Sequence, residues 1–245
     1  MCMFSRPVDR VANTSIFARS SRDGRQFLVY SMTMSAKEDL AMILPLPVPK
    51  DSKEDALRFI NLEKYEDFFK DLRAGFPVPD AKNFGAKGAR GETPALKVVE
   101  VGSFEASFVP ALKDFNRLDE RFRLPGDVWE KLPQYKEFGF AVFKLKKGAK
   151  TIHPMAFEFP RDNPKRLFFP TVHIHDGKVQ ALAAFDHALY CQVTGKEDLE
   201  MKWEESPRPA GMFLKIDKAQ GLLEPALHCY RKALVGKLKN EDILV

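Results

Sequence analysis

Apolar and polar residues alternate along the first third of the chain, and this alternation predicts antiparallel β-structure. Strand-like patterns cover 11–19 and 26–34, with the turn sequence Ser21-Arg22-Asp23-Gly24 between them. Residues 40–44 are almost all apolar, so we expect a third strand that is buried on both faces. This strand should end within 45–49, where three prolines lack the backbone N–H that a sheet requires.

Helical patterns appear at two places. Ser52 and Asp55 resemble a capping pair before an apolar run, which predicts a helix over 53–73. Near the end of the chain, apolar residues recur at spacings of three and four, which predicts an amphipathic C-terminal helix over 222–238. Its apolar stripe consists of Leu223, Leu227, Tyr230, Leu234 and Leu238. His228 lies off this stripe and should face solvent.

Further strand-like patterns occupy the middle of the chain, at 96–101, 104–109, 138–145, 155–159, 167–175 and 178–183. Short helical patterns lie at 112–115 and 128–132. Many short strands without a regular alternation of strand and helix predict a β-rich α+β fold with largely antiparallel sheets and a few flanking helices. Strands from the first third should pair or pack with strands from 138–192.

The segment 77–94 is rich in Pro, Gly, Lys and Ala and has no hydrophobic periodicity, which is typical of a linker or a long loop. We therefore expect a single globular domain over 1–245 with a long loop at 77–94. The alternative is a pair of subdomains, 1–76 and 95–245.

Composition narrows the class of protein. A hydrophobic fraction of 44% with 30% charged residues is typical of a soluble globular protein. The net charge of +5 is small and spread out, so we expect no nucleic-acid partner. No apolar run approaches the roughly 18 residues of a membrane span, and the N-terminus lacks a signal peptide pattern. The three cysteines match no disulfide framework. These features predict a cytoplasmic protein whose partner is a small molecule or a peptide.

Four of the five histidines fall between His153 and Cys191. Within this segment, His173 and His175 would share one face of a strand, with Cβ atoms roughly 6.6 Å apart, and could converge on one metal ion. The alternative is two surface histidines beside the turn Asp176-Gly177.

Whether His187 and Cys191 can share a ligand depends on the secondary structure that carries them. On a helix they would be neighbours able to share a ligand, whereas on a strand they would lie about 13 Å apart. The predicted metal ligands are therefore His173, His175, His187, Cys191 and His153. Mixed His and Cys ligands suit a transition metal such as zinc, copper or iron.

Cys2 is the remaining candidate for chemistry. Removal of Met1 would leave a thiol and an α-amine on one residue, and the amine, which titrates near pH 8, could serve as the base for the thiol. This arrangement predicts an amide hydrolase in which Cys2 is the catalytic nucleophile. Alternatively, Cys2 is a further ligand of the histidine cluster.

A recognisable set of residues lies in the first fifty positions: Cys2, Phe4, Pro7-Val8, Val29-Tyr30, Asp39-Leu40-Ala41 and the Ile-Leu-Pro-Leu-Pro-Val-Pro run at 43–49. With these residues the N-terminal fifth resembles an uncharacterised bacterial family of unknown function. Members begin with a secretion signal and a Cys-Gly-Gly-Phe-Phe-Cys start, whereas this chain has one cysteine there. The resemblance implies a bacterial origin and a role for Cys2, and it implies no activity.

Three functional hypotheses follow from the sequence. The first is a metal-dependent enzyme built on the histidine cluster, and the second is an amide hydrolase that uses Cys2. The third is a non-enzymatic binding or scaffold protein in which the histidines have no catalytic role.

Overall fold

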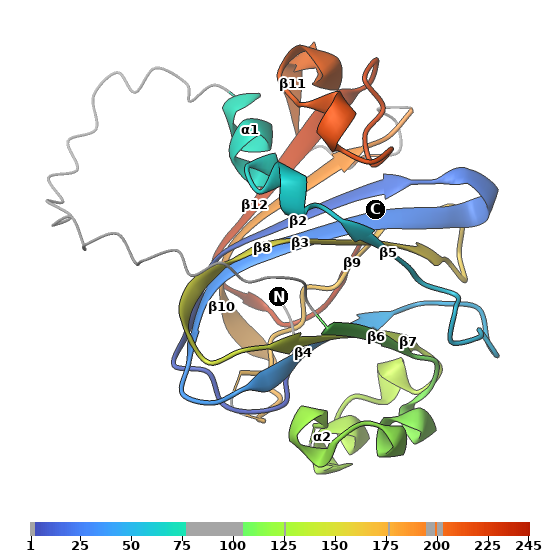
Figure 1. Ribbon diagram of the computed structural model, residues 1–245, viewed down its shortest axis with the longest axis vertical. Coiled ribbons are helices and arrows are strands. Elements are labelled where there is room, and N and C mark those ends of the chain that lie inside the picture. The colour runs from blue at the N-terminus through green and yellow to red at the C-terminus, as the bar shows by residue number, and fades with distance from the viewer. Residues whose placement is uncertain (1–2, 77–104, 125, 176, 195–198, 200–202) are drawn as a thin grey trace, which may run out of the picture.

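Two β-sheets stacked face to face form the centre of the molecule (Figure 1). The computed structural model describes residues 3–76, 105–124, 126–175, 177–194, 199 and 203–245. The larger sheet has seven strands in the order β11-β12-β10-β2-β3-β8-β5, and the smaller sheet has four in the order β1-β4-β7-β6. Pairing between these strands is antiparallel, except that β10 runs parallel to β2. The predicted β-rich, largely antiparallel α+β fold is therefore confirmed.

The larger sheet consists of β2 (Arg10–Ser20), β3 (Arg25–Ala36), β5 (Arg58–Asn61), β8 (Gly148–Pro160), β10 (Leu182–Gln192), β11 (Glu204–Pro209) and β12 (His228–Lys239). The smaller sheet consists of β1 (Met3–Phe4), β4 (Leu40–Leu46), β6 (Glu105–Val109) and β7 (Gly139–Leu145). A separate short pair joins β9 (Phe168–Phe169) to β13 (Ile243–Leu244), and the α-helices are α1 (Phe68–Ala74) and α2 (Gly126–Glu130).

Successive side chains of β3 point to opposite faces of the larger sheet. Leu28, Tyr30 and Met32 point into the apolar layer between the two sheets, whereas Phe27 and Val29 point into the layer on the opposite face. The outer layer contains the apolar side chains of α1, which lies over this face (Figure 1). A hydrophobic layer on each side is the reason why residues 27–30 of β3 are all buried.

The smaller sheet is also covered on both faces. All seven residues of β4 are buried, because Met42 and Leu44 face the larger sheet while Ala41 and Ile43 face α2 and the short 3-10 turns beside it. The prediction that 40–44 is buried on both faces is confirmed. The strand ends at Leu46, within the predicted 45–49, and Pro45 is its last residue but one. Among the described residues, β1 pairs with β4 at Met42 and Ile43, so Pro45 has a paired strand on the β7 side alone.

The expected pairing between the first third and residues 138–192 is confirmed. β4 pairs with β7, β3 pairs with β8, and β2 pairs with β10. Strands on both sides of the segment 77–104 thus contribute to each sheet. The predicted loop at 77–94 and the predicted strand at 96–101 lie outside the described residues.

The predicted C-terminal helix over 222–238 is wrong, because this part of the chain contains β12. Tyr230, Leu234 and Leu238 are spaced by four residues, and four is an even number, so they also share one face of a strand. His228 begins β12 and is half-buried, and its Nδ1 lies 2.7 Å from the backbone oxygen of Ser206 rather than in solvent.

Two other element predictions need correction. The predicted helix over 53–73 is confined to α1, and Arg58–Asn61 instead form β5, which pairs with β8. A short apolar run fits either a helix or an edge strand, so the pattern alone could not separate them. In the predicted strand 167–175 only Phe168–Phe169 are in a strand, and β10 begins at Leu182, near the end of the predicted strand 178–183.

The second half of β12 extends past its neighbour β11. Within the described part of the chain, β11 pairs with β12 opposite residues 228–231, so 233–239 have only β10 beside them. Gly236 has a φ of +96° within this stretch, and Lys237 and Lys239 are exposed. A left-handed residue interrupts the regular strand geometry here.

No helix in the described ranges is both long enough and apolar enough to cross a bilayer.

The C-terminal residues hold the segment after β9 in place. The Oδ1 atom of Asp242 accepts the backbone N–H groups of Thr171 at 2.7 Å and Val172 at 3.0 Å, and its Oδ2 atom accepts the Tyr135 hydroxyl at 2.5 Å. One carboxylate thus ties together the C-terminus, the segment 171–172 and the turns that cover the smaller sheet.

Replacement of this carboxylate should be costly. Asp242→Ala leaves two backbone donors and one hydroxyl without their acceptor, so we expect a loss of about 2–4 kcal/mol in the free energy of unfolding, measured by urea titration. Asp217→Ala, at an exposed position, is the control and should change stability by less than about 0.5 kcal/mol. Equal stability of both variants would contradict this role of Asp242.

Candidate functional site

Three of the predicted site histidines lie next to one another. His173 and His175 lie in the segment between β9 and β10, and His187 lies on β10. The Nε2 atoms of His173 and His187 are 3.2 Å apart, and the rings of His173 and His175 stack with centroids 5.4 Å apart. We call His173, His175 and His187 the histidine cluster.

Hydrogen bonds on both sides fix the position of the segment that carries His173 and His175. The Asn240 side chain accepts the N–H of His173 at 2.7 Å and donates to its carbonyl oxygen at 3.1 Å. On the other side, the backbone N–H of Phe4 donates to the oxygen of Ile174 at 3.1 Å. The start of the described chain therefore lies directly against the segment that carries the cluster, with Met3 bridged to Ile174.

The hydrogen bonds assign a tautomer to the buried pair. The backbone N–H of Asp186 donates to Nδ1 of His187 at 3.1 Å, so Nδ1 is an acceptor and the proton of the neutral ring lies on Nε2. That Nε2–H group points at Nε2 of His173, which then accepts, so His173 carries its own proton on Nδ1. The carboxylate of Asp186 is held in turn by the backbone N–H of Asn13 at 2.8 Å.

Burial keeps both rings neutral. His173 is 7% exposed and His187 is 2% exposed, and the ring of Phe185 lies 4.2 Å from that of His173 between centroids. Loss of solvation lowers the pKa of His173 to about 2 and lowers the pKa of His187 further below its ordinary value. The nearby His175 acts in the same direction on both pKa values.

The geometry of the pair can be compared with that of a metal site. Two imidazole nitrogens bound to a tetrahedral zinc ion at about 2.05 Å lie about 3.3 Å apart, close to the observed Nε2 separation of 3.2 Å. Ligation through Nε2 of His187, however, would require a proton on Nδ1, where the Asp186 N–H already donates. Among the described residues, no three His, Cys, Asp or Glu side chains form a group able to hold a metal ion. The hydrogen-bonded pair is the arrangement that these contacts favour.

The other predicted site residues lie elsewhere. His187 and Cys191 both lie on strand β10, which places them about 13 Å apart along it. Cys191 is fully buried in the layer between the sheets, and burial raises the pKa of its thiol well above the ordinary value. His153 is half-buried on β8, where it lines a separate pocket. Cys2 lies outside the described residues, so its role as a nucleophile or a ligand stays a prediction.

Sequence reasoning missed the residues that hold the cluster. Asn240 and Asp242 follow the last long strand, and nothing in their spacing pointed to a segment seventy residues away. The adjacency of Asp186 and His187 was a usable signal, because a residue's backbone N–H can fix the tautomer of the neighbouring imidazole.

Comparison with known proteins gives a likeness in fold. No family model matches the chain. The crystal structure of baculovirus P35 superposes with a TM-score of 0.52 at 14% sequence identity, over 99% of this chain and 98% of that chain. A mutated baculovirus P35 after caspase cleavage gives 0.48 at 13% identity, over 95% and 98%. P35 in its complex with caspase-8 gives 0.44 at 12%, over 95% of each chain. At such low identity the likeness shows a shared fold alone.

The buried histidine pair should make stability depend on pH. Their folded-state pKa values lie below the unfolded value near 6.5, so the unfolded state binds more protons in acid and stability is lost as pH falls below about 6.5. Each ring should cost about 2 kcal/mol between pH 7 and pH 5. We expect His187→Gln to flatten this dependence by about that amount in urea titrations at the two pH values.

A packing control separates titration from lost contacts. Phe185→Leu removes an aromatic ring that touches the same histidines but leaves an apolar side chain that keeps them buried, so it should lower stability by a similar amount at both pH values. If His187→Gln left the pH dependence of stability unchanged, the pKa of His187 would not differ between the folded and unfolded states, which would contradict this prediction.

Proposed function

We propose that the protein acts by binding another protein and that its partner is a protease of the caspase type. The observation that carries this proposal is the fold shared with baculovirus P35, which extends over nearly the full length of both chains. Two of the similar structures are those of a mutated baculovirus P35 after caspase cleavage and of P35 in a complex with caspase-8. This is the third of the sequence hypotheses, a non-enzymatic binding protein, with a partner class added.

The state of the histidine cluster is compatible with this proposal. Its two most buried rings are used in a hydrogen bond to each other, and the surrounding backbone holds them in place. Such a pair stabilises the junction of β10 with the segment beside it and needs no substrate for that role.

Inhibition of a purified protease tests the proposal. Active caspase-8 is titrated with the folded chain, and the residual hydrolysis of a fluorogenic peptide is measured together with co-elution in size-exclusion chromatography. We expect activity to fall in proportion to the added chain and a complex to elute ahead of either protein. Unchanged activity and no co-elution at a tenfold molar excess would contradict the proposal.

A misfolded variant serves as the matched control. A Cβ at Gly139 would lie 2.6 Å from the Phe108 ring and 2.9 Å from Val48, so Gly139→Val should break the packing of β7 against β6. Circular dichroism and a thermal melt confirm the loss of structure. We expect caspase-8 to degrade this variant and to keep its activity. If the variant inhibited caspase-8 as well as the folded chain does, the inhibition would not depend on the fold.

The second candidate is the metal-dependent enzyme, and the Nε2 separation of 3.2 Å is the observation that favours it. If His173 and His187 are two ligands of one ion, His173→Ala or His187→Ala should remove most bound zinc, copper or iron and its stabilisation of the fold. His228→Ala, at the start of β12, should change neither. Metal analysis of the purified protein and thermal melts with and without a chelator measure both effects. Equal metal content and equal melting shifts in all three variants would exclude this candidate.

A further inference from the structure

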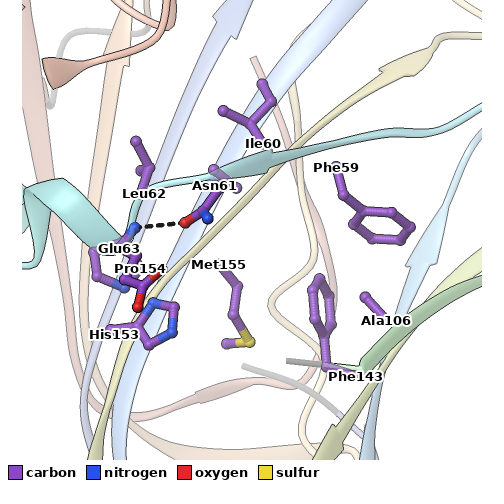
Figure 2. Close-up of a pocket in the computed structure, with 11 residues that line it drawn as sticks. Phe59, Ile60, Asn61, Leu62, Glu63, Ala106, Phe143, His153, Pro154 and Met155 are labelled. Atoms are coloured by element: carbon purple, nitrogen blue, oxygen red, sulfur yellow. Dashed lines mark hydrogen bonds between the residues drawn. The ribbon is translucent and has the colours of Figure 1, made fainter. Parts of the chain in front are cut away.

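A pocket of about 200 Å³ lies where the edges of the two sheets meet (Figure 2). Phe59 and Leu62 contribute from β5 and the turn after it, Met155 from β8, Phe143 from β7 and Ala106 from β6. We call this site the edge pocket. Apolar side chains from both sheets form most of its wall, and Phe59, 38% exposed, packs edge-on against Phe143 with ring centroids 5.8 Å apart.

The volume of the pocket decides what kind of occupant it suits. Sites for cofactors and drug-sized ligands occupy about 300–1,000 Å³. The edge pocket, at about 200 Å³, is smaller, and its size suits one bulky aliphatic or aromatic side chain.

The strands beside the pocket offer backbone groups to the same occupant. In the described part of the chain, β5 is the last strand of the larger sheet and pairs with β8 alone. An edge strand presents a row of N–H and C=O groups, and an extended peptide can add to it while its alternate side chains enter adjoining pockets.

The charges beside the pocket favour an occupant that carries a positive charge. Glu63 forms part of the wall on the same side as His153 (Figure 2). Burial lowers the pKa of His153, whereas the negative charges of Glu66 and Glu63 act on this pKa in the opposite direction. The nearby cation Arg58 is already paired, with its Nε 3.0 Å from Oε2 of Glu158. The carboxylates therefore attract a basic residue in the occupant.

We propose that the edge pocket binds one bulky apolar side chain of an extended segment in a partner protein, with the segment's backbone along β5 and a lysine or arginine next to Glu63. This inference rests on the proposed function, because it requires the partner to be a protein. It adds the chemistry of the segment that is recognised and the place where it binds.

Methionine-methyl NMR of the full chain tests the site directly. The probe is the peptide Gly-Ser-Thr-Leu-Thr-Lys-Ser, and the readout is the Met155 methyl signal, assigned with Met155→Leu; Met32 and Met34, buried on β3, are internal references. We expect a saturable shift of the Met155 signal alone. A probe with alanine in place of leucine should bind at least about tenfold more weakly, because the buried aliphatic side chain supplies most of the affinity.

Variants of the wall test the two parts of the recognition separately. Ala106→Phe fills the pocket and should abolish the Met155 shift, whereas Ala184→Phe, at an exposed alanine of β10, should leave it intact. Glu63→Lys should reverse the charge preference, so that a probe with glutamate in place of lysine binds better than the original probe.

Several results would overturn the proposal. They are no shift of the Met155 signal, equal affinity of the leucine and alanine probes, or binding that survives Ala106→Phe. A Met155 shift that follows protein concentration without peptide would assign the pocket to a second copy of the chain. Binding that appears only after deletion of residues 80–100 would assign the pocket to that segment. None of these outcomes changes the caspase titration, which measures inhibition without a peptide probe, so the two proposals fail separately.

Discussion

The contact between the even-numbered side chains of β3 and those of β4 is the interaction on which the rest of the structure depends. These strands are neighbours in sequence but belong to different sheets, and both deliver apolar side chains to one shared layer. β7 and β8 are joined in the same way, so short connections tie the neighbouring strands β4 and β7 of the smaller sheet to the neighbouring strands β3 and β8 of the larger one. With that stack fixed, β5 and β6 end the two sheets on the same side, and this arrangement creates the edge pocket.

Sequence patterns predicted the strands correctly where several signals agree on a buried strand. The all-apolar stretch at 40–44 is short and leads into three prolines, which favours a buried strand over a helix, and the alternation along β3 also favours a strand. The C-terminal helix failed because Tyr230, Leu234 and Leu238 satisfy both periods, and only pairing with β10 and β11 decides between them. Such pairing is a contact between distant parts of the chain, which local periodicity does not contain.

The candidate site, too, could be predicted from the sequence only in part. The enrichment in histidine predicted that His173, His175 and His187 matter together, and the structure brings these three into contact. The protonation state of the pair could not be predicted, because it depends on one backbone N–H next to His187 and on burial by Phe185. The edge pocket was not predicted from the sequence, since its wall combines the runs 59–63 and 153–156 with single residues of β6 and β7, and only the pairing of distant strands brings these together.

The two open edges of the larger sheet have opposite characters. At the part of β12 that extends past β11, Gly236 has a positive φ outside the usual strand region, and the exposed lysines at 237 and 239 would repel a second copy. Sheet-to-sheet polymerisation through this edge is therefore disfavoured even at high protein concentration. Such protection at one edge allows the short strand at the other to keep its backbone groups accessible without making the molecule prone to form fibres.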